Sequence, residues 1–435
     1  MTESITQLPA IIKIGAAFPG ILIVYRLGVP LGVSIIIHSL LLTFISGEGF
    51  LDGLLYQAQS LLKPEYWLLI LVILLILFFT ESLNNTGRMQ QTITSLKQWL
   101  RNHTMLLAGL PALVGLLPMP GGAMFSAPFI QSIDNKQEIN PAQKTAINYW
   151  FRHIWECWWP LYPGVIFAIH YSGLTAAHFI GLLIYITPVT VVSGYLFLLR
   201  NTHRHTHNTN TVPLDLKAVS ATFLPILLLI FLAVGGSALL QHLYLKKIYA
   251  NLCAMLSGLI ISLTLVLSKN PETIKKSAKI LRNKKTFFLI LVILGVQSFS
   301  SAIVMPINES GTTLVSQMRD EFITLGIPLV PVIILIPFIS GVVTGVAFAF
   351  VGASFPLVFA LVGTDVGFNV LAATTVLAYV SGYLGMLFSP VHICFVITSE
   401  YFKTSLFKVY PYLIGPSLIV FIFGIILSGF YYLVL

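Results

Sequence analysis

The stretch LPMPGGAMFSAP, residues 117–128, interrupts an apolar run that otherwise extends over residues 104–130. A second apolar run, residues 326–361, is interrupted by Gly and Pro from Thr344-Gly345 to Gly352-Ala353-Ser354-Phe355-Pro356. Lipid cannot satisfy backbone amides that a break sets free, so broken backbone at membrane depth must be buried in protein or line a wet cavity. Both runs are therefore predicted to be re-entrant helical hairpins.

The composition of the whole chain favours a membrane setting for these runs. Of the 435 residues, 57% are hydrophobic and 9% are charged, and the mean hydropathy is +0.90. A soluble domain carries about 25% charged residues, which excludes a soluble enzyme, a nucleic-acid-binding protein and a disordered scaffold. About ten further runs have the length of a spanning helix, which predicts an all-α polytopic membrane protein. These runs are residues 9–25, 28–46, 65–83, 143–170, 175–199, 218–241, 248–268, 286–305, 370–400 and 409–433.

Basic residues set the expected orientation in the membrane. Cytoplasmic loops of membrane proteins are enriched in Lys and Arg. Both termini are predicted to be extracytoplasmic, because this orientation places the densest basic run, Lys275 to Lys285, in the cytoplasm and leaves Lys247 outside. The net charge of +9 is explained in the same way and gives no reason to expect a nucleic-acid partner. The chain is expected to be a multi-pass protein of the cell (inner) membrane.

Short motifs recur in the same order in the two halves of the chain. Five such pairs are Glu81-Ser82-Leu83-Asn84 with Gln297-Ser298-Phe299-Ser300, Leu110-Pro111 with Ile336-Pro337, Ser126-Ala127-Pro128 with Ser354-Phe355-Pro356, Tyr162-Pro163 with Ser389-Pro390, and Ser193-Gly194-Tyr195 with Ser428-Gly429-Phe430. Each half would then hold five spans and one hairpin, so the second half would be inverted in the membrane. Inverted repeats with interrupted helices are typical of secondary transporters.

Three motifs also carry a resemblance to a known family. They are residues 117–128, Phe151-Arg152-His153-Ile154-Trp155-Glu156 with Pro160-Leu161-Tyr162-Pro163, and Phe388-Ser389-Pro390-Val391-His392. Over nearly the whole chain, the sequence resembles a prokaryotic family of ten-span integral membrane proteins of unknown function. That family is grouped with the ion-transporter superfamily, beside divalent-anion/sodium symporters, gluconate permeases and arsenite-pump-like carriers.

The resemblance implies an elevator-type carrier that forms a homodimer. Residues 1–102 and 218–322 would build the fixed scaffold, residues 103–199 and 323–435 the moving transport domain, and residues 200–217 a cytoplasmic linker. The Ser-Asn-Thr signature of the symporters is absent from both hairpin tips. Neither a dicarboxylate substrate nor sodium coupling therefore follows from the resemblance.

The hairpin tips supply the first group of candidate binding residues. A helix end in mid-membrane carries about half a unit charge, which attracts an anion at an N-terminus and a small cation at a carbonyl end. Glycines allow a ligand to approach the backbone, and nearby hydroxyls can bind it. The predicted substrate-binding residues at the tips are Gly121, Gly122, Ser126, Thr344, Gly345 and Ser354.

A second group lies in the span over residues 143–170, where Arg152, His153 and Glu156 precede a Pro-rich break. Charges inside a membrane are costly and are usually retained for a task. Arg152 can bind an anionic substrate with two parallel hydrogen bonds, while His153 or Glu156 can carry a coupling proton or cation. The alternative is a structural ion pair, because Arg152 and Glu156 are four residues apart on one helical face. His392, behind the second break, is a substrate-binding candidate or a core histidine.

The remaining features add no chemistry. The three cysteines, Cys157, Cys253 and Cys394, lie far apart in apolar stretches and predict neither a disulfide nor a metal site. Ser298 and Ser301 are expected to cap the end of a span. No cofactor is expected, with Na⁺ as one candidate coupling ion.

Three functions remain open at this stage. The leading hypothesis is an H⁺- or Na⁺-coupled secondary transporter of a small anionic organic solute, and therefore not an enzyme. The alternative within transport is a cation/proton antiporter that uses Glu156 and His153. An intramembrane enzyme is least favoured, because no catalytic spacing of histidines and carboxylates supports it.

Overall fold

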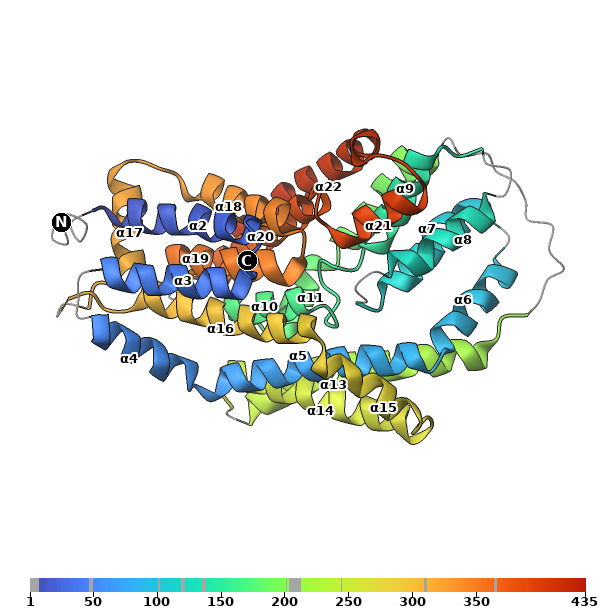
Figure 1. Cartoon of the computed structure of the whole chain (residues 1–435), viewed down its shortest axis with the longest axis horizontal. Helices are drawn as coiled ribbons and strands as arrows, with labels where there is room; N and C mark the ends of the chain where they lie inside the picture. Colours follow the sequence, from blue (N-terminus) through green and yellow to red (C-terminus); the bar gives the residue numbers. More distant parts are fainter. Residues whose placement is uncertain are drawn as a thin grey trace.

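The computed structural model describes residues 8–46, 50–100, 102–118, 122–134, 138–200, 202, 213–243, 245–308, 311–363 and 366–435. Every element longer than a single β-bridge in these ranges is a helix (Figure 1). The predicted all-α fold class is therefore confirmed for this part of the chain. Most of the predicted linker at residues 200–217, including its histidine-rich segment, lies outside the described residues.

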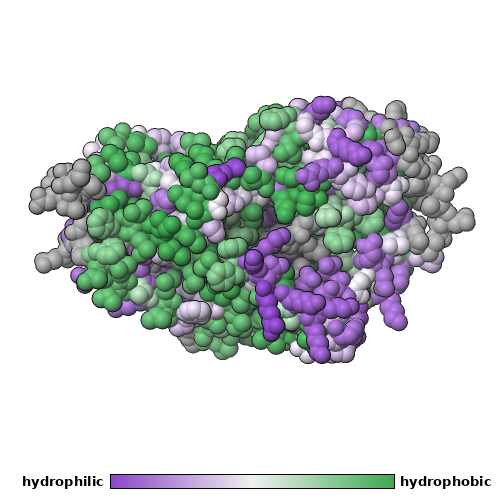
Figure 2. Space-filling view, in the orientation of Figure 1, coloured by the Kyte–Doolittle hydropathy of each residue, from purple (hydrophilic) through white to green (hydrophobic). Residues whose placement is uncertain are grey.

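Seven described helices are long and apolar enough to cross a membrane. They are Pro64–Asn85, Ala176–Leu199, Leu216–His242, Lys247–Ser268, Lys284–Val304, Phe368–Leu387 and Leu406–Val434. These helices indicate a polytopic membrane protein, and the surface agrees, because hydrophobic side chains cover much of one face (Figure 2). Hydrophilic side chains gather toward the end of the molecule where the helix of the basic run, α15, lies in Figure 1.

Three of the ten predicted spans do not form one described helix that is long enough to meet this criterion of length and hydropathy. The first, α2 (Ala10–Arg26), has 17 residues, and the second, α3 (Leu31–Ile45), has 15. The fourth predicted span, residues 143–170, is divided into α9 (Pro141–Arg152) and α10 (Pro163–Ser172).

The first half of the chain continues from α2 and α3 with one long helix and several short ones. They are α4 (Phe50–Leu61), α5 (Pro64–Asn85), α6 (Arg88–Trp99), α7 (His103–Gly115), α8 (Ala123–Ile133), α9, α10, α11 (Ala176–Leu183), α12 (Ile186–Gly194) and the π-helical turn η1 (Tyr195–Leu199). Helix starts follow from capping: the Asn140 side chain accepts from the amide of Gln143, and Pro141 occupies the first helical position of α9.

The second half contains more long helices than the first. Its helices are α13 (Leu216–His242), α14 (Lys247–Ser268), α15 (Thr273–Ser277), the 3₁₀ turn η2 (Ala278–Arg282), α16 (Lys284–Val304), α17 (Leu314–Thr324), α18 (Leu329–Thr344), α19 (Ala347–Val362), α20 (Phe368–Leu387), α21 (Ile393–Tyr401) and α22 (Leu406–Val434). Buried residues occupy every position of α20 from Ala372 to Leu387, so α20 lies at the centre of the core.

The predicted hairpin runs each form two short helices. In the first run α7 ends at Gly115 and α8 begins at Ala123, and in the second α18 ends at Thr344 and α19 begins at Ala347. The second break is shorter than predicted, because α19 continues through Gly352-Ala353-Ser354-Phe355-Pro356. A proline inside a membrane helix is tolerated where neighbouring groups satisfy the freed backbone.

A buried polar network joins α4 to the pair α3 and α16. Ser39 on α3 and Ser298 on α16 contact each other at 2.8 Å, and both donate to the Gln57 side chain on α4. Ser301 donates to Ser60 on α4. The expectation that Ser298 and Ser301 cap a helix end was wrong, because α16 extends to Val304 and both serines point between helices.

Candidate functional site

The first interrupted helix unwinds directly after Arg152. The backbone from His153 to Tyr162 forms turns before α10 begins at Pro163. Two tyrosines of α20 satisfy carbonyls of this segment: Tyr379 donates to Glu156 at 2.8 Å and Tyr383 to His153 at 3.2 Å. The predicted break at the Pro-rich motif therefore begins earlier, because α20 supplies donors that replace the helical hydrogen bonds.

The second interruption separates α20 from α21, and its predicted position is confirmed. Helix α20 ends at Leu387 and α21 begins at Ile393, with His392 as the N-cap residue. Tyr149 on α9 donates to the carbonyl of Leu387 at 3.1 Å, and Ser389 donates to the carbonyl of Val342 on α18 at 2.7 Å. Each interrupted helix is thus stabilised by tyrosine hydroxyls from the opposite half of the chain, and the second break also donates a hydroxyl to the adjacent hairpin.

The two breaks meet through a pair of buried histidines. The Nε2 atoms of His153 and His392 lie 3.0 Å apart, and the Nδ1 atom of His153 contacts the carbonyl of Tyr149 at 2.5 Å. The carboxylate of Glu156 lies 3.9 Å from the same Nε2 of His153. Residues 239 positions apart in the sequence therefore form one imidazole–carboxylate cluster inside the protein.

Arg152 extends this cluster toward α21. Its side chain is 3% exposed, and its Nη1 atom donates to the sulfur of Cys394 at 2.9 Å. The expected sharing of one helical face by Arg152 and Glu156 was wrong, because α9 ends at Arg152. The geometric basis for an ion pair four residues apart on a helix is therefore absent. A guanidinium beside a thiol and two imidazoles is instead a buried group of polar side chains whose charges can bind an ion.

The hairpin tips contact this cluster through their glycines. A Cβ on Gly122 would collide with the guanidinium of Arg152, so the first tip lies directly against that side chain. Gly345 has φ of +64° and ends α18, and a Cβ there would lie 2.8 Å from the Ser389 hydroxyl and 2.9 Å from the His392 amide. Glycine is required at 345 both for the left-handed backbone and for this approach.

Aromatic side chains of the first break hold the end of α7. Trp155 and Trp159 donate to the carbonyls of Ala112 and Leu116 at 2.8 and 3.0 Å, and the Tyr162 hydroxyl donates to the carbonyl of Gly115. These carbonyls belong to the last turn of a short helix, which has no further amides to accept from. The hairpin is thereby fixed to the interrupted helix beside it.

The structure brings six of the predicted residues into this cluster and places the others as follows. Gly122, Arg152, His153, Glu156, Gly345 and His392 converge. Ser126, Thr344 and Ser354 are buried, and their hydroxyls face carbonyls three or four residues earlier in their own helices. Gly121 lies outside the described residues.

Cys394 and Tyr149 belong to the cluster and were missed. Cys394 was interpreted as a small buried hydrophobe because its partners are distant in the sequence. Its position two residues after His392, directly behind the break, is the signal that could have indicated it.

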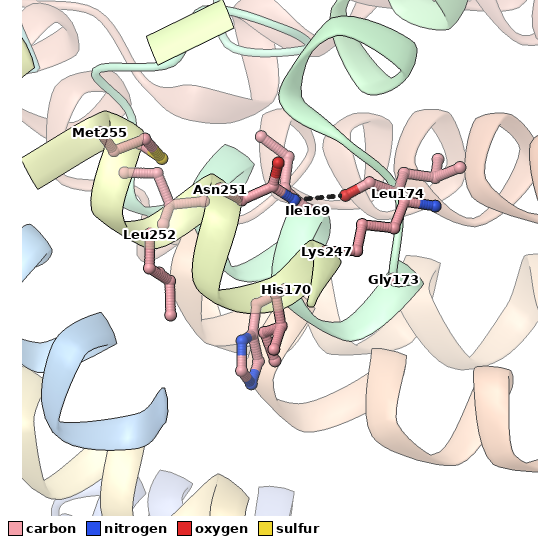
Figure 3. Close-up of a pocket in the computed structure, with 10 residues that line it drawn as sticks. Ile169, His170, Gly173, Leu174, Lys247, Asn251, Leu252 and Met255 are labelled. Carbon is pink, nitrogen blue, oxygen red and sulfur yellow. Dashed lines mark hydrogen bonds between the residues drawn. The ribbon is translucent and has the colours of Figure 1, made fainter. Parts of the chain in front are cut away.

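A separate cavity of about 150 Å³ lies between the end of α10 and the start of α14. Figure 3 shows Asn251 donating to the carbonyl of Leu174 at its edge, with His170, Lys247 and Met255 around it. Its lining is mostly apolar and includes none of the predicted site residues. The predicted site residues thus lie away from this cavity, six of them in the cluster between the breaks.

The fold and this cluster define a polytopic helical membrane protein with a buried ionisable site between two interrupted helices. The chain belongs to the family described as "Protein of unknown function (DUF401)", whose model matches residues 16–434. Comparison with curated proteins gave no match. The relation to the symporters and permeases stays a prediction.

Proposed function

We propose that this protein is an ion-coupled secondary transporter of a small anionic organic solute, with an elevator-type mechanism. The observation that carries the proposal is the burial of Arg152 where two interrupted helices and two glycine-bearing hairpin tips meet. A buried guanidinium suits an oxyanion, because it offers two parallel donors and does not lose its charge. His153 and Glu156 lie beside it and can carry the coupling proton.

The contacts between helices support two inverted repeats of five spans. In the predicted scaffold, α3 packs on α16 and α14 on α5, while α4 packs on α16 and α15 on α5. Likewise α6 packs on α13 and α17 on α2. In the predicted transport domain, α8 packs on α21 and α19 on α10. Exchanging the two halves reproduces this set of contacts, which is the pattern expected for a two-fold axis in the membrane plane.

The elevator mechanism is supported by the way the site is held together. The hydrogen bonds of Tyr149, Tyr162, Tyr383 and Ser389 tie both hairpins and both breaks into one body. This body contacts the scaffold mainly through α19 against α16 and α17, where the contact is apolar in part, as where Gly352 faces Val296. It also contacts the scaffold where α18 packs on α2 and where Asn251 on α14 donates to the carbonyl of Leu174. Such a body can move as a unit along the scaffold, which we propose is the dimerisation part of a homodimer.

A cation/proton antiporter is the second candidate, and one observation favours it. The carboxylate of Glu156 lies 3.9 Å from His153, and its Oε2 atom is buried with no hydrogen-bond partner among the described residues. A carboxylate in this position can exchange a proton for a cation. The antiporter should dissipate a proton gradient in proteoliposomes when Na⁺ or K⁺ is added without organic solute.

The test of the leading proposal is a thermal-shift screen of the purified protein against small carboxylates and other organic anions, with and without Na⁺ and at several pH values. A ligand that binds only the folded state raises the free energy of unfolding by RT ln(1 + [L]/Kd). Arg152→Gln should abolish the shift of a hit, whereas Arg319→Gln, which alters an exposed arginine outside the cluster, should keep it. An anion that stabilises the Arg152→Gln variant as much as the native protein refutes the binding role.

The elevator step is then tested with the same solute. A cysteine pair at positions 296 and 352 should cross-link, because a Cβ on Gly352 lies 2.8 Å from a methyl of Val296. The cross-link should stop uptake until a reductant is added, while each single cysteine leaves uptake intact. Uptake that continues in the fully cross-linked protein would exclude movement of α19 along α16.

A further inference from the structure

Three side chains in the cluster carry donor atoms that metals bind. They are the imidazoles of His153 and His392 and the thiol of Cys394, and one donor atom from each lies within 4.8 Å of the others. All three residues are buried. We propose that this group binds a transition-metal ion of the Zn²⁺ class, and that it does so whether or not the protein transports an organic anion.

The histidine pair has the geometry of two ligands on one ion. The Nδ1 atom of His153 lies 2.5 Å from the carbonyl oxygen of Tyr149, so this nitrogen carries the proton and donates it. The Nε2 atom of neutral His153 then has a free lone pair, which points at the Nε2 of His392 at 3.0 Å. Two imidazoles on a tetrahedral Zn²⁺ have donor atoms about 3.3 Å apart, and a ligating histidine usually donates its other N–H to a carbonyl or carboxylate.

The sulfur selects the class of metal. Imidazole together with thiolate suits Zn²⁺ and related borderline or soft ions, whereas Mg²⁺ and Ca²⁺ require oxygen ligands. Arg152 donates to the Cys394 sulfur at 2.9 Å, which stabilises the thiolate that a metal needs. Arg152 is therefore a positioning residue in this proposal, one that acts on the metal through the sulfur.

Glu156 lies next to these three residues and is the fourth ligand in this proposal, although its carboxylate is outside the group whose donor atoms lie within 4.8 Å of one another. Its Oε1 atom lies 3.9 Å from the Nε2 of His153, and its Oε2 atom is buried with no hydrogen-bond partner among the described residues. With the Cys394 thiolate, this carboxylate would neutralise a divalent ion. The single positive charge of Arg152 would remain in the occupied site.

A shared proton between the two imidazoles is the competing explanation of the short contact. A proton bridge needs only His153 and His392, whereas a metal site also needs the sulfur of Cys394. The two explanations therefore differ in whether the Cys394 sulfur is needed.

The experiment uses the full-length protein in detergent with Zn²⁺ and Co²⁺ as probes. Zn²⁺ at micromolar concentration should raise the apparent melting temperature. Co²⁺ should give the intense visible bands of a tetrahedral complex and an ultraviolet charge-transfer band from thiolate to metal. Loss of an outer-shell partner costs about 10- to 100-fold in metal affinity, so Cys394→Ser should weaken Zn²⁺ binding by at least that factor. The matched control is Cys157→Ser, which removes another buried thiol and should bind as the native protein does.

A second variant keeps the test decisive if Cys394→Ser does not fold. The double variant Cys157→Ser/Cys253→Ser leaves Cys394 as the only thiol and leaves the proposed ligands unchanged. A thiolate-to-Co²⁺ band in this variant supports the site. Its absence in folded protein, a lack of Zn²⁺ stabilisation in the native protein, or equal Zn²⁺ affinity of the Cys394→Ser and Cys157→Ser variants would overturn the proposal.

Discussion

Replacing Gly341 by alanine should separate two helices that the site depends on. Gly341 lies in α18 against α20, where a Cβ would lie 2.5 Å from the amide nitrogen of Met386 and would also press on the carbonyl of Gly382. Ordinary contacts of a Cβ begin at about 3.4 Å. Because both neighbours are backbone atoms, no change of rotamer relieves the clash. The helices must therefore move apart by about 1 Å.

The expected cost follows from two opposing effects. Overpacking of a close contact costs about 1–3 kcal/mol, and alanine in a helix interior is favoured over glycine by about 1 kcal/mol. Because the clash is with backbone atoms, the upper part of the overpacking range applies, about 2–3 kcal/mol, and Gly341→Ala should lower the free energy of unfolding by about 1–2 kcal/mol. Gly429→Ala in α22 is the matched control, because nothing lies within 4 Å of a Cβ at that position. The control should gain up to about 1 kcal/mol from helix propensity alone.

Both variants can be compared by unfolding in mixed micelles with a rising fraction of SDS, followed by tryptophan fluorescence. The decisive result is that Gly341→Ala lowers the free energy of unfolding and Gly429→Ala does not. If Gly341→Ala is as stable as the native protein, or if both variants shift in the same direction, the close packing of α18 on α20 is refuted.

Three further predictions concern the rest of the molecule. Asp134→Asn should lower the free energy of unfolding by about 3–5 kcal/mol, because the Asp134–Lys144 ion pair at 2.7 Å has side chains that are 3% and 6% exposed; adding Lys144→Met should recover part of the loss in the same SDS titration. Tyr379→Phe should cost about 1–3 kcal/mol, because it removes the donor to the buried carbonyl of Glu156 after α9, and a variant as stable as the native protein would contradict the bond. In intact cells, an impermeant maleimide should label Lys247→Cys and not Lys276→Cys, and the reverse pattern would invert the predicted orientation.

The sequence could predict the helical class and the breaks because both have local causes. Long apolar runs need only composition and length to be recognised, and Pro and Gly interrupt helices through their own backbones. The second break, residues 388–392, was placed correctly for this reason. The start of the first break was not, because α9 ends at Arg152 where tyrosines of α20 replace its hydrogen bonds. That cause lies in the other half of the chain.

The candidate site also contains residues that the sequence could predict and one that it could not. Arg152, His153 and Glu156 could be identified because a charge in an apolar span is conspicuous by itself. Cys394 could not, since a cysteine in an apolar helix looks like a small hydrophobe until its neighbours are known. The candidate role of Cys394 follows only from its contact with Arg152 and its proximity to His153, which lie in the other half of the sequence.

The exchange of donors between the halves limits how this protein can move. The Tyr149 hydroxyl binds the end of α20, and the hydroxyls of Tyr379 and Tyr383 bind the segment after α9. Opening the site by parting the two interrupted helices would leave the buried carbonyls of Leu387 and Glu156 unsatisfied, at about 1–3 kcal/mol each, while the His153 carbonyl would keep the amide of Glu156 as a donor. The contact of α19 with α16 includes the apolar pair of Gly352 and Val296. No hydrogen bond is made at that pair, which agrees with the proposed movement of α19 along α16, whereas the bond from Asn251 on α14 to the Leu174 carbonyl would have to break in such a movement.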